Sequence, residues 1–130
     1  MNEITGEEQS IRTMTVACVP EDLFRVACYS RLQISEALVW DLDEAIARAN
    51  YGLRVGKFEL DFDDGEPRFQ VSQILDGEAV GPAVIDRMIG TAVNMMETYL
   101  PAFLAVVYGN EEAGDAIRRV EAGWCGREDE

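Results

Sequence analysis

The sequence of 130 residues contains no histidine and only three cysteines. The absence of histidine excludes a Ser-His-Asp triad, a Cys-His pair and a zinc site built on imidazole. No spacing singles out a pair of catalytic carboxylates, so we expect no catalytic, cofactor-binding or metal-binding residue and interpret the chain as a non-enzyme. Cys18, Cys28 and Cys125 are odd in number and form no CxxC motif. That usage predicts a cytoplasmic protein without a disulfide framework.

Basic residues are also scarce. The chain has 11 Lys and Arg against 25 Asp and Glu, which gives a formal net charge of -14 at pH 7. Phosphate binding needs clustered Lys and Arg, so this balance argues against nucleic acid and against an anionic membrane surface as partners. No apolar run reaches the roughly 18 residues that a membrane span needs. The polar start, "MNEITGEEQS", is not typical of a signal or transit peptide.

The composition that remains is globular, with 48% hydrophobic residues. A chain of this length predicts one domain with a single core. We expect that domain at 10–123, after a disordered segment at 1–9 and before a disordered acidic tail at 124–130.

Hydrophobic periodicity predicts the order ββ-α-ββ-α-α. The expected elements are strands at 10–19 and 23–34, a helix at 36–50, a strand through Phe58, Leu60 and Phe62, a strand at 66–75, a helix from Pro82 to Tyr108, and a helix at about 111–122. Two antiparallel hairpins with helices packed on one face make an α+β sandwich. Pro101 lies inside the long helix and is expected to bend or split it near residues 98–100.

The second predicted hairpin has the clearest pattern, "KFELDFDDGEPRF". Its alternation places Phe58, Leu60 and Phe62 on the core face, and "DDG" predicts a turn with a positive φ at Gly65. Two ligand motifs come near this segment and fail. "GLRVGK" lacks the spacing and the Ser or Thr of a phosphate-binding loop, and "DFDDGE" lacks the ligand positions of a calcium-binding EF-hand.

Three segments carry a resemblance to a known family. "ARANYGLRVGKFELDFDDGE", "ETYLPAFLAVVYG" and "DAIRRVE" resemble the YbjN-domain family, small bacterial proteins labelled as sensory transduction regulators. The resemblance runs from about Ser35 to Glu121. Its distinctive positions are Asn50, Gly56, Phe58, Asp61, Gly65, Tyr99, Pro101, Gly109 and Glu121. The family's fold is similar to that of type III secretion chaperones, which are α+β and usually dimeric, and this implies a protein-binding role by analogy.

Candidate interface residues come from two helical patterns. The long helix is apolar over about twice the arc that one sheet buries, and this arc includes Met88, Met95, Met96 and Tyr99. The surplus belongs either to a homodimer or partner surface or to a neighbouring helix, with Ile117 and Val120 as the side chains that would cover it. Trp40 projects almost opposite to the apolar stripe of its own helix, either as an exposed anchor or tucked against the first hairpin.

Cys18 and Cys28 fall on neighbouring predicted strands. They are either redox partners or two buried thiols that serve as small apolar core residues. For function, we expect a non-enzymatic protein-binding or regulatory module of chaperone-like fold that forms a homodimer. The alternative is a small-molecule sensor or an enzyme with a pocket between the sheet and the long helix.

Overall fold

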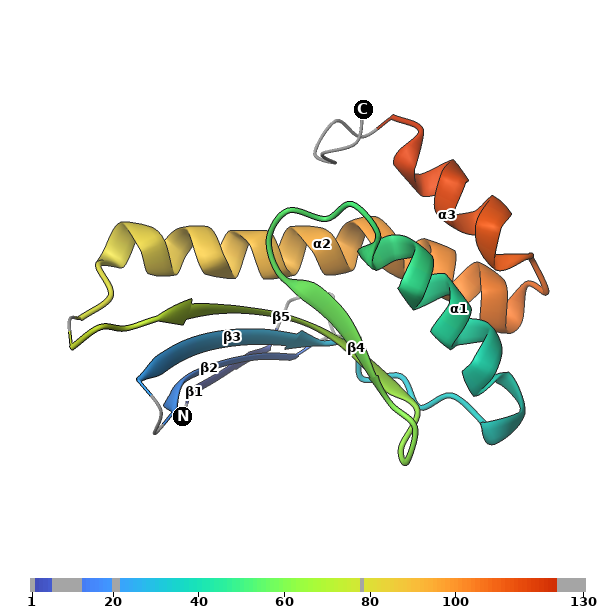
Figure 1. Ribbon diagram of the computed structural model, residues 1–130. Coiled ribbons are helices and arrows are strands. Elements are labelled where there is room, and N and C mark those ends of the chain that lie inside the picture. Colours follow the sequence, from blue (N-terminus) through green and yellow to red (C-terminus); the bar gives the residue numbers. More distant parts are fainter. Residues whose placement is uncertain (1, 6–12, 20–21, 78, 124–130) are drawn as a thin grey trace.

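The computed structural model describes residues 2–5, 13–19, 22–77 and 79–123, with β1 and β2 described by their backbone pairing (Figure 1). The elements in chain order are β1 (Asn2–Thr5), β2 (Thr13–Val19), β3 (Leu23–Tyr29), the 3-10 helix η1 (Glu36–Leu38), α1 (Val39–Asn50), β4 (Lys57–Asp61), β5 (Glu66–Ile74), α2 (Pro82–Tyr108) and α3 (Ala113–Glu121).

The strands form one antiparallel sheet in the order β1-β2-β3-β5-β4. The α+β class is confirmed, but the prediction of two hairpins with four strands in all is wrong. The sheet has a fifth strand, β1, which pairs along β2 at residues where we expected disorder. Backbone groups make this pairing, and "NEIT", with a single isoleucine, is too short to give an apolar alternation that would reveal it. The rest of the expected disordered segment, and the tail at 124–130, lie outside the described residues.

The core lies between one face of the sheet and α2. Strand alternation directs Val26 of β3, Phe69 and Val71 of β5 and Phe58 of β4 to this face, and all four are buried. Val26 lies opposite Val71, and Phe58 lies opposite Phe69, in the strand registers. In Figure 1, α2 extends along this face, and no helix among the described residues covers the opposite face.

The long helix α2 is a single helix from Pro82 to Tyr108. The predicted split near residues 98–100 is therefore wrong. Pro101 is exposed, as is Glu97 one turn before it. Pro101 has no N–H to donate to the Glu97 carbonyl, and this position lies on the exposed side of the helix, so the helix continues without burying the affected backbone. No helix in the described part of the chain is both long enough and apolar enough to cross a membrane.

The two shorter helices gather at the C-terminal part of α2. Helix α1 packs against α2 and β4, and α3 packs against both α1 and α2. Ile117 of α3 is buried and Val120 packs against the core at its edge. The hydroxyl of the buried Tyr99 donates to Glu121 Oε2 at 2.6 Å, which ties the end of α3 to the middle of α2. A neighbouring helix therefore covers the surplus apolar arc in this part of α2.

Candidate protein-interaction site

The turn between β4 and β5, residues 62–65, is held against the chain that follows β3. Gly65 has the positive φ that the sequence predicts, 68°. Its N–H donates to the Asp61 carbonyl at 2.7 Å, and its own carbonyl accepts the Ile34 N–H at 3.0 Å. A Cβ at this position would overlap the backbone of Ile34. Glycine is therefore required twice here, for its φ angle and for the close approach of two backbones.

Side-chain carboxylates complete the turn. Asp61 Oδ1 accepts the Asp63 N–H at 2.8 Å, and Asp64 Oδ1 accepts the Glu66 N–H at 2.9 Å. These are local Asx-type bonds that reinforce the turn. Glu66 Oε2 accepts the Arg31 N–H at 3.1 Å from the segment after β3. The turn is thus fixed both internally and to its neighbour, which makes it a rigid platform.

An exposed aromatic pair lies beside this turn. Trp40, in the first turn of α1, packs edge-to-face against Phe62, with ring centroids 4.8 Å apart. Trp40 is 70% exposed and Phe62 is 42% exposed. We call these two residues the aromatic pair. The pair joins two elements far apart in sequence and leaves most of the indole in water, which is typical of an interface anchor rather than of a core residue.

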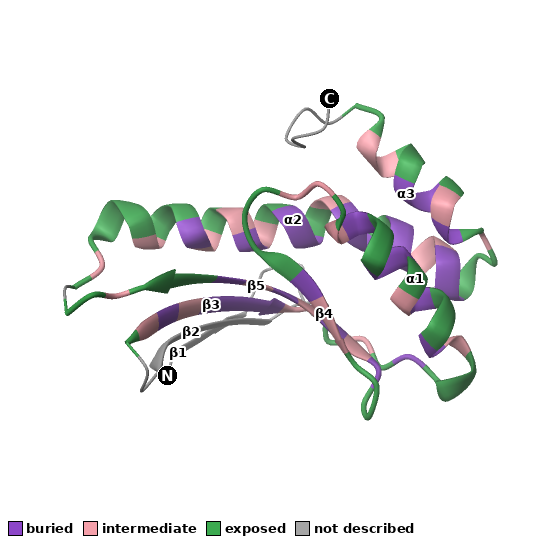
Figure 2. Ribbon diagram, viewed as in Figure 1, coloured by how far each residue is buried: buried purple, intermediate pink, exposed green. Residues whose placement is uncertain are grey.

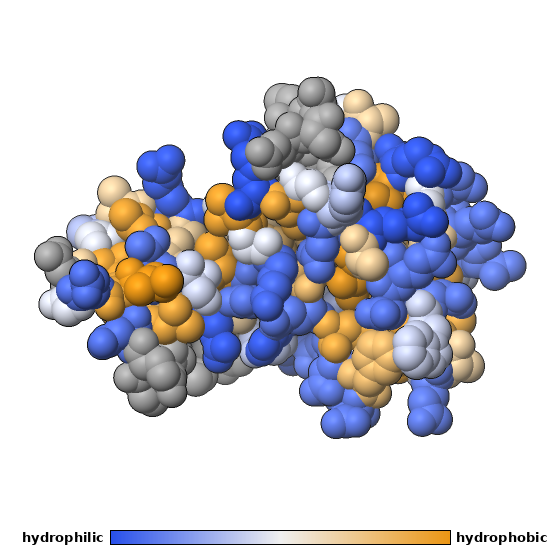
Figure 3. Space-filling model, in the orientation of Figure 1, coloured by the Kyte–Doolittle hydropathy of each residue, from blue (hydrophilic) through white to orange (hydrophobic). Residues whose placement is uncertain are grey.

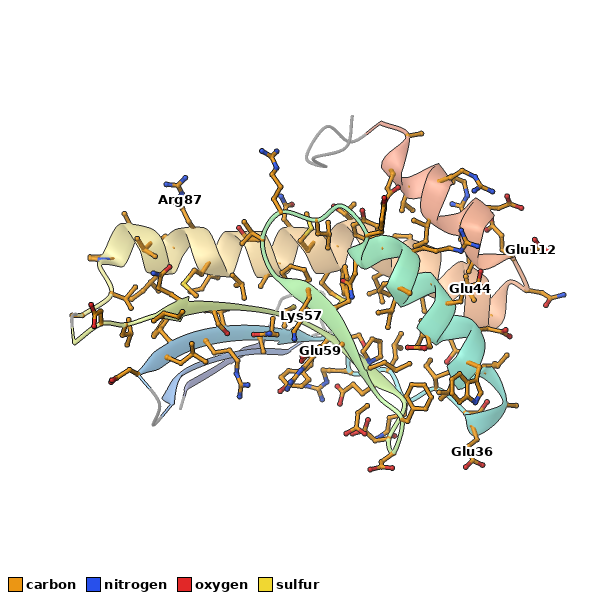
Figure 4. All side chains as sticks on the ribbon, viewed as in Figure 1. Glu36, Glu44, Lys57, Glu59, Arg87 and Glu112 are labelled. Atoms are coloured by element: carbon orange, nitrogen blue, oxygen red, sulfur yellow. The ribbon has the colours of Figure 1, made fainter. Side chains whose placement is uncertain are left out.

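A cleft of about 530 Å³ lies on the helix-free side of the turn. It is lined by Tyr29, Glu59, Leu60, Asp61, Asp64, Glu66 and Arg68, and we call it the acidic cleft. The guanidinium of Arg68 donates from Nε to Glu59 Oε1 at 2.6 Å and from Nη1 to the Tyr29 hydroxyl at 3.0 Å. Figure 4 shows Lys57 and Glu59 side by side on β4, where their charged groups are 3.2 Å apart.

The charges of the acidic cleft perturb one another. Partial burial raises the pKa of Glu59, but the hydrogen bonds from Arg68 and Lys57 outweigh burial and bring this pKa below its ordinary value. Burial alone would lower the pKa of Arg68, and its bonds to Tyr29 and Glu59 raise it instead. The pKa of Glu66 is raised, because burial and the negative charges of Asp64 and Asp61 outweigh the hydrogen bond and the positive charge of Arg31. The cleft therefore has a paired region at Arg68 and a negative region at its acids.

The structure separates the five residues that the sequence suggested as an interface. Met88, Met95, Met96 and Tyr99 are buried in the core of a single chain. They face the sheet, α1 or α3, so their placement at a surface is corrected. Only Trp40 is exposed. Of the two interpretations of Trp40, the exposed anchor agrees with its 70% exposure, and its aromatic neighbour belongs to the turn of the second hairpin.

Sequence reasoning missed Phe62 as a surface residue. Alternation placed it with Phe58 and Leu60 on the core face, but β4 ends at Asp61 and Phe62 belongs to the turn. Once the strand ends, its period no longer sets the direction of a side chain. The run "FDDG" was the available signal. Four-residue hairpin connections are common, and a connection of that length ending at Gly65 includes Phe62.

The alternative pocket between the sheet and α2 is filled by aromatic side chains. The ring of Phe58 lies 4.9 Å from Phe69, 5.4 Å from Tyr99 and 5.2 Å from Phe103, measured between centroids. A second cleft, of about 450 Å³, lies instead between α1 and the connection from α2 to α3. Its side chains are mostly charged, and Figure 4 shows Glu44 and Glu112 at this end of the molecule. Arg48 pairs there with Glu44, and Arg118 with Asp115.

The register of β2 and β3 decides the arrangement of two cysteines. Cys28 is buried and lies opposite Met14, whereas Cys18 lies opposite Phe24. Met14 and Cys18 are four positions apart on β2, which is about 13 Å of strand, and a disulfide needs Cα atoms within about 7 Å. The strand register therefore places Cys18 and Cys28 too far apart for a disulfide with each other. Within the described residues, no group of three or more His, Cys, Asp or Glu side chains is arranged to hold a metal ion.

The fold and the site define a small α+β protein with one helix-covered sheet face and an exposed aromatic anchor. A family model described as "YbjN: Putative bacterial sensory transduction regulator" matches residues 3–105. The match covers well over half of the sequence, so the chain belongs to the YbjN family. Comparison with curated proteins and with solved structures gives no significant match. The likeness to type III secretion chaperones therefore stays a prediction.

Several positions that carry the family resemblance have structural roles. The Asn50 side chain accepts the Phe58 N–H at 2.8 Å and donates to the Phe58 carbonyl at 3.0 Å, so it satisfies backbone groups of the edge strand β4. Gly56 has a φ of 78°, and a Cβ there would overlap the Phe69 ring. Tyr99 holds Glu121, as described above. These residues stabilise the fold. Trp40 is not one of the positions that carry the family resemblance.

Proposed function

We propose that this YbjN protein is a non-enzymatic, cytoplasmic protein-binding module whose partner docks on the aromatic pair. The observation that carries the proposal is the exposure of Trp40, 70%, while its ring is held in place by Phe62. An isolated exposed aromatic residue is common, but an exposed pair on a rigid platform has already lost the freedom that binding would otherwise remove. The cysteine usage supports the cytoplasm, and the charge of -14 argues against nucleic acid and anionic membranes.

The test is capture of partners by the immobilised full-length protein from a lysate of the source organism, followed by mass spectrometry. We compare the unchanged protein with Trp40→Ala and Phe62→Ala. The matched control is Tyr51→Ala, because Tyr51 is 75% exposed at the other end of α1. We expect at least one protein that the unchanged chain and the control retain and that both pair variants lose. An identical set of captured proteins for all four chains would reject the aromatic pair as the docking site.

We further propose that the chain forms a homodimer. The contact surface is the end of the molecule where α2 begins, in place of the methionines of α2 that the sequence suggested. Figure 3 shows apolar surface gathered at this end. Ile74 at the end of β5 is 78% exposed and Val84 in the first turn of α2 is 40% exposed. Both line a cleft of about 320 Å³ with Leu75 and Val80. A twofold contact would bury this apolar surface on both copies.

Light scattering after size exclusion tests the dimer. We expect twice the chain mass of 14.5 kDa, and a shift to the single-chain mass for Ile74→Asp combined with Val84→Asp. Trp40→Ala should remain dimeric and is the control. A single-chain mass for the unchanged protein at all concentrations from micromolar upward would reject the dimer and leave the aromatic pair unaffected.

A further inference from the structure

The charges around the aromatic pair indicate what kind of partner it binds. We propose that the aromatic pair and the acidic cleft together bind a basic segment of a partner protein, with a guanidinium or apolar side chain on Trp40 and cationic side chains in the cleft. This inference rests on the proposed function and adds the chemical class of the partner. Three observations support it.

The first observation is the unneutralised charge next to Phe62. Asp61, Asp63 and Asp64 surround this ring in sequence, and none of them forms an ion pair within the part of the chain that the structure describes. Asp61 and Asp64 each use Oδ1 for a backbone N–H of the turn. Their charge is thus held in place by the turn and is not compensated by a cation.

The second observation is the imbalance inside the acidic cleft. Four of its lining residues are acids and one, Arg68, is a cation. Arg68 is already bound to Glu59 and Tyr29, so it compensates Glu59, and Arg31 partly offsets the charge of Glu66. Asp61 and Asp64 keep their charge in the cleft. Burial is the main cause of the raised pKa of Glu66, and the charges of Asp64 and Asp61 add to it against the opposing effect of Arg31. A cation placed in this region relieves the negative potential of the two aspartates, whereas an anion increases it.

The third observation is the nature of the anchor. Indole is the best side chain for a cation–π contact, and Trp40 offers most of its ring to solvent. Figure 4 shows a further acid, Glu36, at the start of η1 at the same end of the molecule. The net charge of -14 adds long-range attraction for a basic segment and repulsion for an acidic one. The indole of Trp40 and the negative electrostatic potential of the protein therefore both favour a basic partner segment.

The experiment measures binding of a dye-labelled octapeptide of alternating arginine and leucine to the full-length protein by fluorescence anisotropy. The comparison peptide has glutamate in place of each arginine. We expect saturable binding of the arginine peptide that weakens as salt is added, and no binding of the glutamate peptide. Absence of binding for the arginine peptide, or equal binding of the two peptides, would overturn the inference.

Matched variants separate a site from the general charge of the protein. Asp61→Asn combined with Asp64→Asn keeps the oxygen that accepts each turn N–H and removes two charges. We expect affinity for the arginine peptide to fall by about fivefold or more, since each charge near a bound cation contributes on the order of 0.5 kcal/mol. The control, Asp76→Asn with Asp86→Asn, removes two exposed charges near the start of α2, and we expect less than a twofold change.

Equal loss in the two double variants would overturn the inference, because it would show an effect of net charge alone. Asp63→Asn is a second test that does not depend on the stability of the double variant, because the Asp63 side chain accepts none of the hydrogen bonds that hold the turn. This variant should lower the affinity for the arginine peptide by about twofold. An unchanged affinity would count against the site. The two proposals can also fail separately. If a natural partner is lost by Trp40→Ala but retained by Asp61→Asn with Asp64→Asn, the proposed function stands and this inference is overturned.

Discussion

The two halves of α2 have different surroundings, although one helical pattern runs through both. From Tyr99 to Val107, most side chains are buried by the sheet on one side and by α1 and α3 on the other. From Pro82 to Asn94, only Met88 and Ala92 are buried, and the outer side is open to solvent. Figure 2 shows this change along the helix, from mostly exposed at its start to mostly buried towards its end.

The same division extends to the rest of the molecule. At the covered end lie α1, α3 and the β4–β5 turn that carries the aromatic pair. At the open end lie the start of α2 and the end of β5, where Ile74 is exposed. The comparison teaches that apolar content does not by itself indicate an interface. Apolar side chains at the covered end stabilise the fold, and the exposed ones at either end are those available to partners.

The largest expected effect compares one core residue with one surface residue of the same helix. Phe103→Ala at the covered end should lower the free energy of unfolding by about 3–5 kcal/mol, because it leaves a cavity among Phe58, Tyr99 and their neighbours. Arg87→Ala at the open end, where the side chain is exposed, should change it by less than about 0.5 kcal/mol. Urea unfolding measures both. Similar losses for the two variants would show that the halves of α2 do not differ in packing.

A smaller effect compares two glycines with nearly equal φ angles. Gly65, in the turn at the covered end, has φ 68°, and Gly77, in the loop before α2, has φ 76°. An alanine at Gly77 meets nothing within 4 Å, so its effect is the left-handed backbone alone, about 1 kcal/mol. An alanine at Gly65 also displaces the backbone of Ile34, so we expect about 2–4 kcal/mol from strain and overpacking together. Equal denaturant midpoints would show that the turn does not contact this segment.

The smallest expected effect concerns pH and the ion pairs of β4. The pKa of Glu59 lies below its ordinary value of 4.5, so its ionised form stabilises the fold above that pH and loses this contribution as the pH falls through the folded-state pKa. Glu59→Gln should therefore melt below the unchanged protein at pH 7, by an amount equivalent to less than about 1 kcal/mol, and the difference should shrink as the pH falls below 4.5.

Glu66→Gln is the control of opposite sign. The pKa of Glu66 is raised in the folded state, so its stabilising contribution is present below about pH 4.5 and is lost as the pH rises. This variant should gain stability relative to the unchanged protein between pH 4 and pH 7. The same direction of change for both variants would contradict the assignment of their partners.

Local patterns predicted much of the scaffold. The alternation around "DDG" identified β4, the turn, β5 and the positive φ of Gly65 because turn geometry depends on a few adjacent residues. The helical period identified α1 and α2 to within a few residues. The site was predicted only in part. Trp40 was recognised because it departs from the stripe of its helix, whereas Phe62 was assigned to the core because its strand was extended one residue too far.

The sequence by itself determined the class of the fold, the absence of histidine chemistry and the negative charge, since these depend on composition and on neighbours along the chain. Only the tertiary structure decided which apolar side chains are covered. Whether Met96 or Trp40 meets another element depends on where α3 and the β4–β5 turn lie, and those contacts join residues about twenty or more positions apart. Local propensity carries no information about such distances, so burial and exposure along α1 and α2 follow from packing alone.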